Sequence, residues 1–346
     1  MQENESDVNP FDSPETLLNN HSEEHPNSIV SIMLGVWSAY LLPVICGIGL
    51  LGSLMFIGVL FCKPKQLTRQ LIYMVCVFMA NVATNILFAW LWIFPAKGLP
   101  YATNGSIYYF TFQTSTAMCK LHRFAYSFTS TASCNLLLLA SVDRMLLIYH
   151  PVTFSSTPKR YSWYASGIVT VVSAIMMLPM LGYVTLVPIQ NKMICWFPPT
   201  YQFLEAYHVL FSNSALVQPM LVGILNLTFL IRLRRYAFRR RNRRVNPKNR
   251  NHLRSSFTLF VLSAVYIVFS LPQSFAYLAA YTISNHRKTL DAHVRLAYNI
   301  ADLGWNLYFL REVANIIVLF RFIPPFRHFV LSLFHCCSCC CHKHPE

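Results

Sequence analysis

The stretch CKLHRFAYSFTSTASCNLLLLASVDRM, residues 119–145, decides the fold of this chain. Its pattern indicates an apolar helix that begins at a cysteine and ends at the charged pair Asp143-Arg144. Charged residues at the end of a membrane-length segment are costly and usually have a function. The stretch therefore predicts a membrane-spanning helix with a functional charged pair at its far end.

Six further apolar stretches accompany this helix. The chain has 346 residues, of which 55% are hydrophobic and 12% are charged, about half the charged fraction of ordinary soluble domains. A helix of about 20 apolar residues crosses a bilayer core. The predicted spans are 32–61, 70–95, 121–148, 161–187, 204–231, 256–281 and 296–321. We therefore expect an all-α fold, a single seven-helix transmembrane bundle.

The distribution of charge predicts the topology of the bundle. Residues 1–30 hold seven acids and no Lys or Arg, whereas residues 232–254 hold eleven Lys or Arg and no acid. Positively charged loops stay in the cytoplasm, so we expect an extracellular N-terminus. We interpret the basic run as a topology signal that also attracts membrane lipids, and seven apolar spans argue against a nucleic-acid partner. The predicted parts are a disordered, glycosylated extracellular segment 1–30, the bundle 31–322, and an amphipathic helix with a cysteine-rich cytoplasmic tail, 323–346.

Glycosylation motifs agree with this topology. Asn4, Asn20 and Asn104 each begin an Asn-x-Ser motif on the predicted outer side, and we expect all three to be glycosylated. Asn226 also begins such a motif, but it lies in the fifth predicted span and should be unmodified.

The cysteines fall into groups with different predicted chemistry. Cys119 begins the third span and Cys195 precedes the fifth, so both are expected outside the cell, where disulfides persist. A bridge between them would pin the loop across the mouth of the bundle. The tail cysteines are predicted to be palmitoylated at the membrane surface: Cys336, Cys337, Cys339, Cys340 and Cys341. A metal cluster with the nearby histidines is the alternative, but contiguous cysteines lack paired-ligand spacing.

Residues 324–335 have apolar residues at helical spacing and begin with proline. Such a segment favours an interfacial helix on the inner leaflet, anchored by the cysteines that follow it. We expect no metal and no cofactor in the protein.

These features together resemble the rhodopsin-like (class A) G-protein-coupled receptors. In that family the cysteine that heads the third helix precedes the arginine of an Asp-Arg-Tyr motif by 25 positions, as Cys119 precedes Arg144 here. Pro219 and Pro272 match prolines of the fifth and sixth helices. Asn315, with Phe326-Arg327 after it, aligns with the Asn-Pro-x-x-Tyr motif and the start of the eighth helix. The resemblance covers about residues 30–340.

Several motif positions depart from the family pattern. Asn81 replaces the usual aspartate of the second helix, and Met145 replaces the tyrosine after Arg144. The sixth-helix motif reads Phe269-Ser270-Leu271-Pro272, so its aromatic toggle is absent or moved to Phe269. The chain is therefore identified as a divergent, orphan-type member.

The resemblance implies a G-protein switch made of Asp143, Arg144, Asn315, Pro272 and Phe269. Arg144 is expected to pair with Asp143 at rest and to turn towards the G protein when the sixth helix moves, a two-state element. Alternatively, Arg144 only extends to the interface. The sequence has no acid between Glu205 and Asp291, so a second carboxylate partner from the sixth helix is excluded. We predict raised basal activity.

Asn81, Ser133 and Asn315 fall where relatives bind a sodium ion. Without the aspartate the site lacks its charge, so sodium binding is not expected. Arg311 and Glu312 lie one turn outward of Asn315, and adjacent residues do not share one helix face. We therefore expect no mutual salt bridge, and we expect Arg311 to donate to Asn81 or Ser133 in place of sodium. A purely structural role is the alternative.

The ligand pocket is expected to open outward between the third, fifth, sixth and seventh helices. Tyr126 stands where amine receptors carry an aspartate, which disfavours a monoamine ligand. Phe309 stands where opsins carry a lysine, which excludes an opsin. Arg123 would suit a carboxylate or phosphate, or it only lines the loop surface. The candidate pocket residues are Arg123, Tyr126, Ser127, Trp196, His208, Gln273, Tyr277, Asp302, Trp305 and Phe309.

The expected function is a multi-pass plasma-membrane receptor that activates a heterotrimeric G protein. Its extracellular ligand is of open class: a peptide, an anionic lipid or another small molecule, including an odorant. The alternative is an atypical receptor that scavenges ligand without signalling. A transporter is disfavoured because no inverted repeat is visible. We expect no enzymatic activity, because the spans bring no histidine near their few acids.

Overall fold

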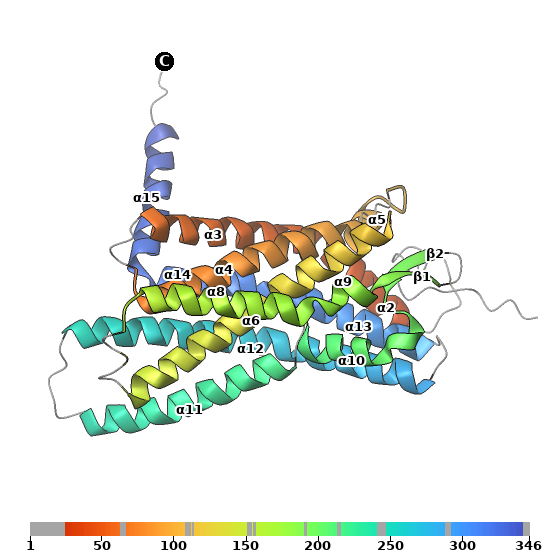
Figure 1. Ribbon diagram of the computed structural model, residues 1–346. Coiled ribbons are helices and arrows are strands. Elements are labelled where there is room, and N and C mark those ends of the chain that lie inside the picture. The colour runs from red at the N-terminus through yellow and green to blue at the C-terminus, as the bar shows by residue number, and fades with distance from the viewer. Residues whose placement is uncertain are drawn as a thin grey trace, which may run out of the picture.

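The computed structural model describes residues 25–62, 67–107, 112, 114–150, 154, 157–189, 192–212, 216–240, 247–287 and 292–341. Long helices form an elongated bundle (Figure 1). A two-stranded hairpin lies at one end of the bundle, and helix α15 lies at the other. These two ends are called the hairpin end and the α15 end below.

Within the described residues, six helices are long and apolar enough to cross a membrane: Ile29–Cys62, Arg69–Ala102, Thr116–Tyr149, Arg160–Tyr183, Phe257–Ser284 and Leu296–Phe322. The fifth predicted span, 204–231, is divided between α10 (Gln202–Phe211) and α11 (Val217–Arg240). Within α11, Val217–Arg232 forms a shorter apolar helix. The structure therefore agrees with the predicted helical bundle of seven spans.

The first two spans contain wide helical turns. The first comprises α2 (His25–Val36), the π-helical η1 (Trp37–Leu41) and α3 (Leu42–Cys62). The second comprises α4 (Arg69–Thr84), the π-helical η3 (Asn85–Gly98) and α5 (Leu99–Ala102). Pro95 lies inside η3 and cannot donate a backbone hydrogen bond there. Gly98 allows a close approach to η1, since an added Cβ would lie 2.3 Å from the Ser38 carbonyl oxygen.

The third span is the single helix α6 (Thr116–Tyr149), which the Ser115 side chain caps by accepting from the Met118 N–H. The fourth comprises α8 (Arg160–Met177) and α9 (Pro179–Tyr183). Strands β1 (Thr185–Ile189) and β2 (Lys192–Trp196) follow as an antiparallel hairpin, and η5 (Pro199–Tyr201) leads into α10. This hairpin is the exception to the all-α expectation.

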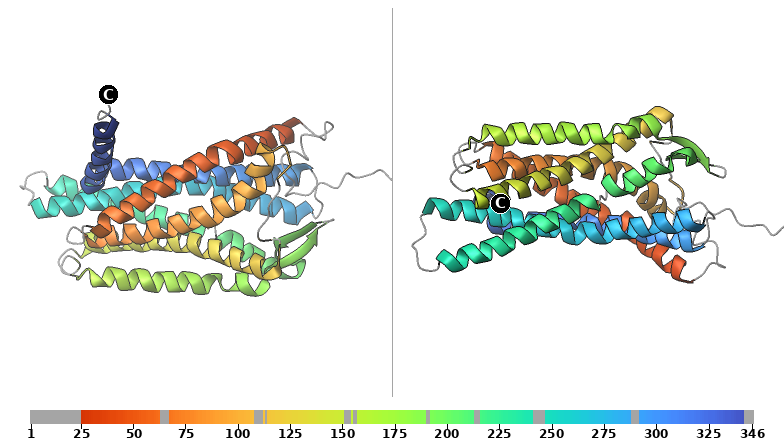
Figure 2. Two further views of the ribbon diagram at one scale, coloured as in Figure 1. Left: turned by 90° about the horizontal axis from the view of Figure 1, so that it is seen from above. Right: turned by 60° about the horizontal axis from the view of Figure 1, so that its bottom comes forward.

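The sixth span is α12 (Pro247–Arg287), and the seventh comprises α13 (Ala292–Tyr308) and α14 (Leu310–Phe322). Helix α15 (Pro324–Cys341) extends the predicted eighth helix and lies crosswise to the bundle (Figures 1 and 2). Its Phe326 ring packs edge-on against Phe56 of α3, with centroids 5.9 Å apart.

The predicted boundary between the N-terminal segment 1–30 and the bundle lies too far along the chain. Helix α2 already begins at His25, so residues 25–30 are helical rather than part of a disordered segment. Residues 1–24, with the glycosylation candidates Asn4 and Asn20, lie outside the described residues.

Candidate functional site

Five aromatic rings join three spans in the hairpin half of the bundle. The Phe88 ring of η3 lies 4.6 Å from Trp305, 6.1 Å from Phe309 and 5.1 Å from Tyr126, between centroids. Trp92, one turn further along η3, lies 4.9 Å from Tyr126 in an edge-on contact. Three predicted pocket residues therefore lie in one aromatic cluster, which also contains Phe88 and Trp92.

Arg123 lies at the border of this aromatic cluster and is only 2% exposed. Its guanidinium carbon lies 4.5 Å from the ring centroid of Trp196, 5.2 Å from Trp92 and 5.4 Å from Tyr126. An Arg Nη2 atom lies 3.1 Å from His208 Nε2. Four predicted pocket residues thus converge on one another: Arg123, Tyr126, Trp196 and His208.

The predicted disulfide explains how Trp196 reaches Arg123. Cys195 of β2 is bonded to Cys119, which lies one helical turn before Arg123 on α6. This bond confirms the predicted pairing and fixes β2 above α6. Trp196, the next residue of the strand, then covers the guanidinium.

The positive charge of Arg123 has no ion-pair partner in the part of the chain that the structure describes. The Glu205 carboxylate accepts a hydrogen bond from the Trp196 indole N–H at 3.1 Å. Arg123 Nε is buried and has no hydrogen-bond partner among the described residues. Arg123 is therefore a buried cation beside rings and a histidine, and the Glu205 carboxylate attracts it only from beyond ion-pair distance. Cation–π attraction compensates its burial only in part.

The other pocket candidates divide into two groups. Ser127, one turn along α6 from Arg123, and Gln273 of α12 are fully buried, and their side-chain polar atoms lack partners among the described residues. Tyr277 makes an edge-on contact with Tyr298. Asp302, in contrast, forms an ion pair with Lys97 of η3. The structure thus directs Asp302 towards the second span and not towards Arg123.

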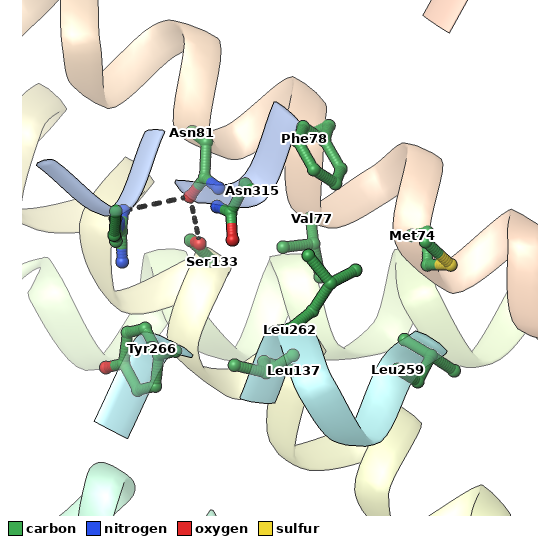
Figure 3. A pocket seen from close by; sticks show the side chains of 11 residues that line it. Met74, Val77, Phe78, Asn81, Ser133, Leu137, Leu259, Leu262, Tyr266 and Asn315 are labelled. Atoms are coloured by element: carbon green, nitrogen blue, oxygen red, sulfur yellow. Dashed lines mark hydrogen bonds between the residues drawn. The ribbon is translucent and has the colours of Figure 1, made fainter. Parts of the chain in front are cut away.

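A polar cluster lies in the middle of the bundle, as predicted. Asn81 Oδ1 accepts hydrogen bonds from Ser133 Oγ at 2.5 Å and from Arg311 Nη2 at 3.1 Å (Figure 3). The expected contact between Arg311 and Asn81 is therefore present. The cluster also borders a cavity of about 20 Å³, room for one water molecule. Its wall combines polar and apolar side chains: Met74, Val77, Phe78, Asn81, Ser133, Leu137, Leu259, Leu262, Tyr266, Arg311 and Asn315.

The expectation for Arg311 and Glu312 was wrong in one respect. Arg311 Nε donates to Glu312 Oε1 at 3.1 Å, and both side chains are only 2% exposed. The helix is interrupted at Phe309, so both residues lie in the first turn of α14, where long side chains can turn towards each other. Gly49 of α3 makes room for Glu312, since an added Cβ would lie 2.6 Å from the Glu312 Cβ.

At the α15 end, the partner of Asp143 differs from the expected one. The Asp143 carboxylate forms an ion pair with Arg69, at the start of α4, and accepts from the Tyr73 hydroxyl at 3.4 Å. Arg69 also donates to the Phe154 carbonyl. The predicted Asp143–Arg144 pairing is therefore corrected: Arg69 takes the place expected for Arg144.

Arg144 extends instead between α6, α11 and α12, and it is only 1% exposed. Its Nη2 atom lies 2.8 Å from Ser141 Oγ, 3.1 Å from Asn226 Oδ1 and 3.0 Å from Ser263 Oγ. Asn226, whose glycosylation motif was expected to be unused, is thus a buried partner of Arg144. One guanidinium connects three spans through uncharged oxygens.

The remaining predicted sites are located as follows. Pro272 is exposed within α12, Phe269 is half-buried, and Asn315 is 7% exposed. Asn104 is exposed in the turn after α5, with φ of 45°. Cys336, Cys337, Cys339, Cys340 and Cys341 belong to the backbone of α15, but their side chains lie outside the described residues.

Sequence reasoning missed residues that border the predicted spans. Arg69 and Lys97 lie just outside the predicted second span, 70–95, and Glu205 lies near the start of the fifth. All three contact predicted site residues: Arg69 binds Asp143, Lys97 binds Asp302, and Glu205 binds Trp196. A charge at the edge of an apolar segment was the available signal.

Comparison with known proteins identifies the family. The model of the seven-transmembrane receptors of the rhodopsin family matches residues 52–303. The chain belongs to this family, as the motif resemblance predicted. It is also similar to G-protein coupled receptor 183-A of Danio rerio, with 25% identity over 241 residues. That match covers 67% of this chain and 61% of the relative, so the chain spans less than two thirds of the relative's length.

Proposed function

We propose that the protein is a plasma-membrane receptor with an extracellular N-terminus that binds an outside ligand and activates a heterotrimeric G protein. Its family membership supports the receptor class. The acidic segment 1–30 and the basic segment 232–254 support the orientation. In this orientation the hairpin end receives the ligand and the α15 end receives the G protein.

The position of Arg144 is the observation that carries the proposed coupling. Its contacts with α11 and α12 go to the uncharged oxygens of Asn226 and Ser263, while Asp143 is engaged with Arg69. A hydrogen bond to an uncharged acceptor is weaker than one to a carboxylate. The hydrogen bonds of Arg144 to α11 and α12 therefore break at low cost when either helix moves. This low cost favours a two-state switch with raised basal activity.

Two continuous helices connect the ligand region with this switch. Helix α6 carries Arg123 near one end and Arg144 near the other. Helix α12 carries Gln273 on the hairpin side and Ser263 on the α15 side. A ligand that binds the two arrangements of these helices with different affinity shifts their populations, which is sufficient for coupling.

The test is a G-protein dissociation panel in cells that express the full chain, without added ligand. We expect a basal signal above that of vector controls for wild type, and its loss in Arg144→Ala. Arg160→Ala is the matched control, because Arg160 is an exposed arginine at the start of α8. A signal that is equal in wild type and Arg144→Ala, at equal surface expression, would contradict the proposal and favour a scavenging receptor.

A further inference from the structure

The unpaired charge of Arg123 indicates that the site is completed by a partner from outside. The guanidinium is 2% exposed, and no carboxylate in the described part of the chain forms an ion pair with it. A buried cation without a carboxylate is costly. The rings of Trp92, Tyr126 and Trp196 offset part of that cost through their negative faces. The Glu205 carboxylate, bonded to Trp196, attracts Arg123 only from beyond ion-pair distance among the described residues. The missing component is an anion in direct contact with the guanidinium.

Several neighbouring polar groups are also incomplete. Arg123 Nε, His208 Nδ1, Ser127 Oγ and both amide atoms of Gln273 are buried and have no partner among the described residues. They come from α6, α10 and α12, the elements that surround the predicted pocket. Four of these atoms are, or can be, hydrogen-bond donors. A cation with additional donors is the usual chemistry for binding an oxyanion, and the planar guanidinium suits a carboxylate or phosphate.

The surroundings of these groups are apolar. Trp92 and Tyr126 belong to the aromatic cluster and also contact Arg123. From Tyr126 the cluster continues through Phe88 to Trp305. Trp196 is half-buried and covers Arg123 on the hairpin side. An anion bound to Arg123 would therefore lie beside the Trp196 side chain, and an apolar group attached to it would lie against rings.

We propose that Arg123 binds the acid group of a small amphipathic ligand, a carboxylate or a phosphate carried on an apolar body. This inference rests on the proposed receptor function and defines the chemical class of its ligand. The acid group completes the donor set of Arg123, His208, Ser127 and Gln273. The apolar body packs against the aromatic cluster.

The test uses the full chain in lipid nanodiscs and two pairs of probes. Oleate is compared with oleyl alcohol, and oleoyl lysophosphatidate with monooleoylglycerol, by their effect on the thermal unfolding midpoint. We expect at least one acid to raise the midpoint of wild type while its neutral counterpart does not. The probe that acts distinguishes a carboxylate from a phosphate ligand.

Substitutions then locate the effect. We expect Arg123→Gln to weaken binding of the active acid by about tenfold or more, because a charge-assisted contact is lost. Lys120→Gln, on the preceding turn of α6, removes the charge of a half-buried side chain that donates to the Gly182 carbonyl, and it should leave binding within about twofold. Arg123→Met is the second variant if Arg123→Gln fails to fold.

Two outcomes overturn the inference. The first is that neither acid stabilises wild type more than its neutral counterpart, a result that needs no variant. The second is that the Arg123 variant binds the acid as wild type does. Basal signalling that depends on Arg144 is measured in the same cells. If that signal persists while the acids have no effect, the ligand class is wrong and the receptor function stands.

Discussion

Two buried arginines, Arg311 in the polar cluster and Arg123 at the hairpin end, have the same exposure, and both lie against aromatic rings, but their polar partners differ. Each is 2% exposed. Arg311 is paired with Glu312 and bonded to Asn81, whereas Arg123 lies against His208 and forms no ion pair with the described residues. Removing one partner of a buried ion pair leaves an uncompensated charge, but removing an unpaired cation does not. The polar cluster is therefore complete in itself, and the hairpin end is not.

Arg144 is intermediate between these two cases. It is as buried as the others, but its contacts across the bundle go to the uncharged oxygens of Asn226 and Ser263. The difference predicts three roles. Arg311 stabilises the fold, Arg144 stabilises one of the two arrangements of the helices, and Arg123 binds a ligand. Substitutions that separate stability from signalling test this division.

The largest expected effect is on stability, in Arg311→Ala. This change leaves the Glu312 carboxylate buried and unpaired, which should cost about 3–5 kcal/mol. Thermal unfolding of the purified receptor measures it. Arg321→Ala, an exposed arginine of the same helix, should have little effect. A double change, Arg311→Met with Glu312→Leu, should recover much of the loss, because it removes both charges. An Arg311→Ala protein as stable as wild type would contradict the comparison.

The next-largest effect is expected in Arg69→Ala, which should lower both the stability of the protein and its basal signal. Asp143 loses its ion partner, at a cost of about 1–3 kcal/mol, and becomes available to the adjacent Arg144. We expect a lower basal signal, because Asp143 then pairs with Arg144 and keeps its guanidinium from turning towards the G protein. G-protein dissociation at matched surface expression measures it. Adding Asp143→Asn should restore the signal, and an unchanged signal in Arg69→Ala would show that Asp143 does not compete for Arg144.

A small stability effect is expected in Arg123→Gln, in contrast with Arg311→Ala. Arg123 forms no close ion pair among the described residues, and the nearby Glu205 carboxylate keeps its hydrogen bond from Trp196. Unfolding stability should therefore stay within about 1 kcal/mol of wild type, or rise. Thermal unfolding without added lipid acid is the measurement. A loss as large as that in Arg311→Ala would mean that Arg123 is a structural residue and that the two regions do not differ.

The smallest effect is expected at the Lys97–Asp302 pair. Its side chains are 14% and 31% exposed, so water and salt weaken the attraction. Lys97→Ala should cost about 0–1 kcal/mol, and the difference from wild type should shrink as salt is added. Unfolding midpoints at low and high salt measure this. A large, salt-independent loss would place Lys97 among the buried structural charges.

Much of the architecture followed from local sequence patterns. The apolar spans, the Cys119–Cys195 bond and the contact of Arg311 with Asn81 were all predicted and are present. Hydropathy predicts spans because a bilayer requires apolar helices of a certain length. The spacing of the motifs also predicted where the charged residues lie within those spans.

The partners of the charged residues could not be predicted in the same way. Asp143 and Arg69 are 74 positions apart, and Asp302 and Lys97 are 205 apart. Such pairs depend on how the spans rotate and pack, which hydropathy leaves undetermined. The Arg311–Glu312 pair was missed for another reason: helical spacing assumes an unbroken helix, and the seventh span is interrupted at Phe309.

The π-helical segment η3 bears on how deletions act in this chain. A π-turn spans one residue more than an α-turn, and η3 continues in this form over Asn85–Gly98. Loss of a single residue there would let one of its wide turns tighten into an α-turn and reorient the side chains around that turn. Trp92 would turn away from Arg123, and Lys97 would turn away from Asp302. A family member that lacks one residue in this segment should therefore have a differently arranged aromatic cluster, even if every other residue were the same.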